Sequence, residues 1–122
     1  MNFMRTEQIR YHTFNSKKAA ELLPASDRIS NTEDMLELMA NARYSDADIV
    51  FIHSGNLPDG FFKLSTGIAG EILQKFSNYR MKLAIIGDFT DIKSKNLRQF
   101  IGESNRWGII SFVGSLEEAM KK

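Results

Sequence analysis

Hydrophobic positions change period repeatedly along the C-terminal two thirds of the chain, and this pattern predicts strands and helices in alternation. Residues 48–53, 81–86 and 109–113 are short, nearly continuous apolar runs. Such runs are typical of strands that are covered on both faces of a parallel sheet. Between them, apolar residues recur at helical spacing over residues 64–76 and 97–101.

Glycine and serine positions suggest where these helices begin, end and pack. Gly67 and Gly70 are three residues apart, so they share one helix face. We expect them to let that helix approach the sheet closely. The next helix is expected to end within residues 102–105. Ser115 and Glu118 match a capping box, which predicts a short last helix.

The N-terminal third leaves one choice open. Residues 9–14 are typical of a strand, and Ser30 or Asn31 can cap a helix over the apolar positions that follow. Residues 17–23 favour a helix by propensity alone. A turn at residues 15–16 would instead fold them back on the first strand as a β-hairpin.

The order of elements predicts the fold class. Strands that alternate with helices at this spacing are parallel and joined by right-handed crossovers. The 122 residues fit one compact domain, residues 1–122. We therefore expect a single α/β domain with mostly parallel strands.

Composition excludes several kinds of chemistry. The chain has no cysteine, which excludes thiolate zinc sites and cysteine nucleophiles, and its two histidines have no metal-ligand spacing. A formal charge of +1 gives no electrostatic footprint for nucleic acid. No apolar run approaches membrane-spanning length, and the start lacks the apolar core of a signal peptide. We expect a cytoplasmic protein without a cofactor.

Several unusual strings carry a resemblance to a known family. From about residue 17 to 120, the chain resembles a bacterial family described as domain of unknown function 4180. The resemblance implies that residues 18–23 form a strand, so it favours the hairpin and an N-terminal order of strand, strand, helix. Trp107 departs from the family, which usually has a small residue there. The strings are Asn41-Ala-Arg-Tyr44, Asn56-Leu-Pro58, Phe61-Phe62, residues 66–79, residues 83–89 and Glu103-Ser-Asn-Arg106.

A second likeness is one of topology. The expected order of elements is similar to that of the anti-sigma-factor-antagonist (STAS) domains. This similarity implies binding of a protein partner, often switched by phosphorylation at a helix start. The corresponding residues here are Ser65 and Thr66. Either hydroxyl could instead cap the helix, which is the more common role.

Two further groups of polar residues are candidates for binding. Asp88 ends a parallel strand, at the edge where open α/β sheets bind ligands, or it bonds its own turn. Glu103, Asn105 and Arg106 gather near a helix end, where they complete that end or form a polar contact surface. Trp107 is the aromatic residue that we expect to be exposed at an interface.

Some charged side chains have a predominantly structural interpretation. His12 and His53 are expected to be solvated strand residues, although His53 could serve as a general base. Glu71 pairs either with Lys75 one turn later or with Arg80 or Arg106.

Two functions follow from these patterns. The first is a non-enzymatic regulatory or protein-interaction module that binds a protein partner or a second copy of itself. The alternative is a small α/β enzyme or ligand-binding domain that uses the strand-end edge near His53, Asp88 and Glu103. A pocket that joins these three side chains would support the alternative.

Overall fold

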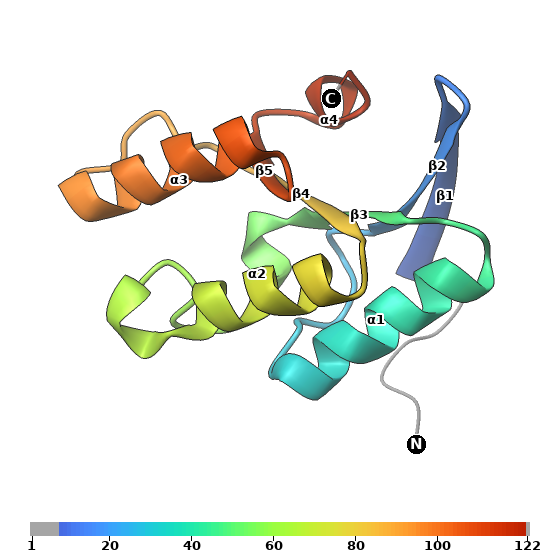
Figure 1. Cartoon of the computed structure of the whole chain (residues 1–122), viewed down its shortest axis with the longest axis horizontal. Coiled ribbons are helices and arrows are strands. Elements are labelled where there is room, and N and C mark those ends of the chain that lie inside the picture. The colour runs from blue at the N-terminus through green and yellow to red at the C-terminus, as the bar shows by residue number, and fades with distance from the viewer. Residues whose placement is uncertain (1–7, 122) are drawn as a thin grey trace.

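A computed structural model describes residues 8–121, and it shows one mixed α/β domain (Figure 1). None of the helices in this part of the chain is both long enough and apolar enough to cross a membrane. The order of elements agrees with the order expected from the sequence. The strands are β1 (Ile9–Phe14), β2 (Lys17–Leu22), β3 (Ile49–His53), β4 (Lys82–Ile86) and β5 (Ile110–Val113). The helices are α1 (Thr32–Tyr44), α2 (Ile68–Asn78), α3 (Lys95–Trp107) and α4 (Leu116–Ala119), with short 3₁₀ helices η2 (Ser54–Asn56) and η3 (Leu64–Thr66).

The first two strands form the hairpin. Asn15 and Ser16 both have positive φ angles, 49° and 62°, which is the geometry of a two-residue hairpin turn. The turn fixes the antiparallel register, in which Phe14 pairs with Lys17 and the pairing continues to Ile9 with Leu22. The family resemblance was therefore the better guide, and helix propensity over residues 17–23 was wrong because strand pairing overrides it.

The strand order places three helices on one face of the sheet. The order is β1-β2-β3-β4-β5, and every pair after the hairpin is parallel. Because each crossover advances by one strand in the same direction and is right-handed, α1, α2 and α3 must fall on the same side. We call this side the helical face. It carries the larger core, which includes Leu22, Ile52, Ile85 and Phe112.

The opposite face, which we call the open face, has much less cover. Figure 1 shows α1 and α2 together below the sheet and the four-residue helix α4 above it. The open face carries a separate small core of Ala19, Phe51, Ala84, Ile86 and Val113, against which α4 packs through Ala119. The expectation that helices cover both faces of the parallel strands is therefore only partly correct.

Two helices differ from their expected bounds because of glycines in left-handed conformation. Gly67 has a φ of 78°, so it separates η3 from α2, and α2 begins at Ile68. Gly108 has a φ of 86° and ends α3, which continues through residues 102–105 to Trp107. These conformations suit glycine because it has no Cβ.

Close backbone approach occurs at a glycine other than the expected pair. A Cβ at Gly67 or Gly70 would meet nothing within 4 Å, so the prediction that they pack against the sheet was wrong. A Cβ at Gly87 would lie 2.6 Å from the Ser54 hydroxyl oxygen and 3.0 Å from the Phe89 ring. Gly87 is therefore the residue whose small size the fold requires.

The predicted N-cap residues are confirmed, but the capping box at Ser115 is only partly formed, because the Glu118 carboxylate accepts from the Gly114 amide, at 2.7 Å, one residue before the expected donor. The Asp34 amide donates to Asn31 Oδ1 at 2.9 Å, and the Glu118 amide donates to Ser115 Oγ at 3.1 Å. Glu71 forms neither of the expected ion pairs within the described chain. Its carboxylate accepts a hydrogen bond from the Thr32 hydroxyl, which joins α2 to the start of α1.

Two glycine substitutions should have opposite effects on stability. Gly87→Ala should lower the free energy of unfolding by about 1–3 kcal/mol, because its methyl group overlaps Ser54. Gly70→Ala should raise it by roughly 0.5–1 kcal/mol, because Gly70 lies exposed inside α2 with free space around it. Urea denaturation of both variants measures the two effects. Equal effects of the two substitutions would contradict this assignment.

Candidate functional site

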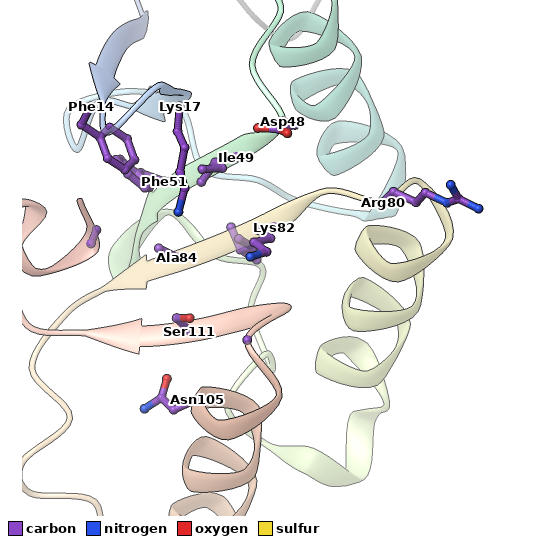
Figure 2. A pocket seen from close by; sticks show the side chains of 13 residues that line it. Phe14, Lys17, Asp48, Ile49, Phe51, Arg80, Lys82, Ala84, Asn105 and Ser111 are labelled. Carbon is purple, nitrogen blue, oxygen red and sulfur yellow. The ribbon is translucent and has the colours of Figure 1, made fainter. Parts of the chain in front are cut away.

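A groove crosses the open face between the hairpin and α4 (Figure 2). Its volume is about 280 Å³. Phe51 and Ala84 lie at its base and are buried, while Phe14 and Ile49 are half-buried along its side. We call this hollow the sheet groove. Its walls are mainly apolar, so it suits side chains of a partner better than a small polar substrate.

Charged side chains stand at one end of the sheet groove. Lys17 begins β2 and Lys82 begins β4, and both line the hollow together with Asp48 before β3. Figure 2 shows Lys17 extending from the hairpin over β3, whereas Arg80 points away from the sheet. Within residues 8–121, Lys82 makes no ion pair.

A buried carboxylate between two imidazoles lies on the same face. Glu21 accepts hydrogen bonds from Nε2 of His12 and Nε2 of His53, each at 2.7 Å. The Glu21 side chain is only 5% exposed. Because an ionised carboxylate can only accept, each imidazole must carry its proton on Nε2. The three residues join β1, β2 and β3 side by side.

The environment of Glu21 favours its ionised form. Burial, the largest single effect, raises the pKa of the carboxyl group. The hydrogen bonds from His53 and His12, and then the charges of these two residues, together lower the pKa by more than burial raises it. The net effect is a pKa below the ordinary value. Both histidines were expected to be solvated strand residues, and this was wrong because each one compensates the burial of Glu21.

Glu21 itself was missed in the sequence, although a signal was present. It interrupts the apolar end of β2, and a carboxylate at a buried position needs a partner. A hairpin turn at residues 15–16 pairs His12 with Ala19 and Arg10 with Glu21. Since alternate residues share one face, this register already places His12 beside Glu21.

At the strand-end edge, Asp88 is satisfied by its own turn. Its Oδ1 accepts from the Thr90 hydroxyl at 2.6 Å and from the Thr90 amide at 3.1 Å. These two bonds, the hydroxyl first, lower the pKa of Asp88. Of the two interpretations that the sequence allowed for Asp88, this geometry matches the one in which it bonds its own turn.

The two hydroxyls near α2 have different surroundings. Thr66 Oγ1 donates towards the carbonyls of Gly60 and Lys63, at 2.8 and 2.9 Å, and accepts from the Ile68 amide at 3.3 Å. Thr66 therefore holds the loop before α2. Ser65 is exposed in η3, and its hydroxyl has no hydrogen-bond partner within the described chain.

At the end of α3, Asn105 has a structural role. The Phe112 amide donates to Asn105 Oδ1 at 2.6 Å, and Asn105 Nδ2 donates to the Phe112 carbonyl at 3.3 Å. The ladder to β4 uses the carbonyls of Ile109 and Val113 instead. The Asn105 amide thus occupies the outer edge of β5, where another strand could otherwise pair.

The neighbours of Asn105 do not form one site with it. Glu103 accepts from the Gln99 side chain one turn earlier, at 3.2 Å. Arg106 is exposed, and Trp107 is 64% exposed at the helix end, as expected for a surface aromatic. The three side chains therefore act separately.

The residues of the alternative function are likewise held apart by their partners. His53 is bonded to Glu21 on the open face, Asp88 to Thr90, and Glu103 to Gln99 on α3. A hollow of about 420 Å³ at the strand ends is lined by Asp88 and Asn105 but by neither His53 nor Glu103. Among the described residues, no group of three or more histidine, aspartate or glutamate side chains is arranged so that it could hold a metal ion.

Comparison with known families places the chain among its relatives. The sequence model of a family described as "Domain of unknown function (DUF4180)" matches residues 14–122. The chain belongs to this DUF4180 family. The match confirms the resemblance noted from the sequence strings. No curated protein and no solved structure matches the chain significantly, so the likeness to STAS domains stays a prediction.

Neutralising Glu21 in this DUF4180 domain should reveal how much the buried carboxylate stabilises the fold. Glu21→Gln should lower the free energy of unfolding by about 1.5–3 kcal/mol near neutral pH, the size of a hydrogen bond to a charged group. A folded-state pKa below the ordinary value means that this contribution is present above about pH 4.3 and is lost as the pH falls further. In urea denaturation from pH 7 to pH 3, the free energies of unfolding of wild type and Glu21→Gln should converge as the pH falls.

The control for this measurement is Glu103→Gln, which removes a carboxylate outside the cluster. It should change the free energy of unfolding by less than about 0.5 kcal/mol, as surface substitutions usually do. A constant difference between wild type and Glu21→Gln at all pH values would contradict the role assigned to the ionised Glu21.

Removing the Asn105 amide should expose the edge of β5. Asn105→Ala leaves the amide and carbonyl of Phe112 without partners, which should lower the free energy of unfolding by about 1–3 kcal/mol. Hydrogen exchange at the Phe112 amide should accelerate, since that amide loses its acceptor. Arg106→Ala is the control and should leave this exchange unchanged. Unaltered exchange in Asn105→Ala would show that the amide does not protect the edge.

Proposed function

We propose that this protein is a non-enzymatic interaction module that binds a protein partner on the open face of its sheet. The observation that carries the proposal is the unequal cover of the two faces. Three helices pack on one face, and four residues of α4 cover part of the other. Parallel strands are usually covered on both faces, so a partner would complete the missing layer.

The strand order argues against the alternative enzyme or ligand-binding domain. Small ligands of open α/β sheets usually bind where the strand order reverses, because the crossovers diverge there and leave a crevice. The order β1-β2-β3-β4-β5 contains no such reversal. In addition, the hydrogen bonds of Asp88 and Glu103 are made within their own segments.

The contacts of His12, Glu21 and His53 argue against a catalytic role for this cluster. Both carboxylate oxygens already accept a hydrogen bond, and both bonds link strands. The hydroxyl of Ser54, the residue after His53, lies against Gly87. These contacts favour a role in holding the hairpin to the sheet.

The similarity in topology to STAS domains supports the same proposal, because those domains bind protein partners. In this proposal, a switch by phosphorylation falls on Ser65 and not on Thr66. The Ser65 hydroxyl is exposed, whereas Thr66 Oγ1 is used to hold the loop. Arg106 and Trp107 lie at the end of α3, outside the residues that line the sheet groove.

Site-specific photo-crosslinking in the native cell tests the proposal. A benzoylphenylalanine replaces Phe14, which lines the sheet groove. The matched control replaces Tyr79, an aromatic residue that is 56% exposed and lines a different hollow beside α1 and α2. We expect a discrete protein adduct from position 14 and none of the same mass from position 79. Adducts from position 79 alone, or from neither position, would overturn the proposal.

A further inference from the structure

The sheet groove restricts what kind of segment can occupy it. The backbone groups of a sheet interior are used in the ladders between β2, β3, β4 and β5. An occupant of the face must therefore be held through side chains and cannot add as another strand. A helix is the element that normally covers a parallel sheet in this way.

The apolar residues of the groove fit a short amphipathic helix. Phe14 and Ile49 form a half-buried side, and the small residues Ala84 and Ser111 continue from Phe51 across β4 and β5. Small side chains on a sheet let a helix approach closely. At the far end, Ala119 of α4 lines the hollow, so an occupant must stop there.

The charges at the open end determine the sign of the partner. Lys17 and Lys82 line this end of the groove, whereas Arg80 points away from the sheet (Figure 2), and among the described residues Asp48 is the one acidic side chain that lines it. Lys82 and Arg80 make no ion pair within residues 8–121. A second copy docked face to face with the same ends of the two grooves together would bring the two sets of lysines together, which is unfavourable. Acidic side chains are complementary to this end.

From these features we infer that the sheet groove docks an acidic amphipathic helix of a partner protein. The apolar stripe of that helix lies on Ile49 and Ala84, and its carboxylates lie at the end that carries Lys82. This inference rests on the proposed function and adds to it the chemistry of the partner. It commits to a heterologous partner rather than to a second copy of the chain.

Two synthetic peptides provide a defined probe. Both are stapled helices of equal length with the same leucine and alanine stripe, but one has glutamates on its polar face and the other has lysines. Each is titrated into the full-length, ¹⁵N-labelled protein. We expect saturable shifts of the Ile49, Ala84 and Ser111 amides with the acidic peptide, and at least tenfold weaker binding of the lysine peptide.

Charge reversal at the groove distinguishes electrostatic recognition from general stickiness. Lys82→Glu should lower the affinity for the acidic peptide about tenfold and raise the affinity for the lysine peptide. The affinities of Lys82→Gln for the two peptides should lie between those of wild type and Lys82→Glu. Position 82 is exposed, so neither substitution should disturb the fold. The matched control is Lys95→Glu, at an exposed position at the start of α3, and it should leave both affinities unchanged. Added salt should lower the affinity for the acidic peptide only, because it screens the attraction between unlike charges.

Several outcomes would overturn the inference. These are equal binding of the two peptides, an unchanged preference in Lys82→Glu, absence of binding, or shifts confined to the hollow beside α1 and α2 that is lined by Leu36, Met39 and Met81. Self-adducts from a crosslinker at Phe14 would indicate a second copy. If the position-14 crosslink gives a partner but the acidic peptide fails, only the partner chemistry is wrong. Failure of both rejects the interaction module as well.

Discussion

The handedness of the crossovers governs the whole arrangement of this domain. Each connection from β2 to β3, from β3 to β4 and from β4 to β5 advances by one strand in the same direction. A right-handed connection can then place its helix on one side only, so all three helices accumulate on the helical face. The other face is left to the hairpin and to α4, which has four residues. A large core and an accessible groove are two results of the same constraint.

Polar side chains stabilise the β5 edge and the open face of the sheet. Asn105 supplies an amide to the outer edge of β5 and so takes the place of a neighbouring strand. Glu21 carries a charge into the open face, and His12 and His53 compensate it from the strands on either side. Because Asn105 occupies the backbone edge of β5 beside the sheet groove, a partner must recognise the groove through side chains.

Much of the fold could be predicted from the sequence because its signals are local. Apolar periodicity predicted the strands and helices, and the caps at Asn31 and Ser115 were recognised from residue type and spacing. The helix bounds were less accurate. A left-handed conformation at Gly67 or Gly108 depends on how the chain turns towards the sheet, and the sequence pattern around a glycine does not distinguish that from packing.

The candidate site was harder to predict because it depends on contacts between distant segments. Asp88 and Thr66 were recognised as polar residues at element ends, but the structure shows that each bonds its own loop. Glu21 meets a histidine 32 residues away, and that meeting requires β2 and β3 to be neighbours in the observed register.

The sequence by itself determined the order of elements, the local caps and the absence of cysteine chemistry. The first two depend on residues that are close together in the chain, and the third depends on composition alone. Only the tertiary structure decided that one face stays open, which side chains line the sheet groove and how Glu21 is paired. The physical reason is that strand order, crossover hand and register act together over the whole chain, and small changes in any of them would bring different residues into contact.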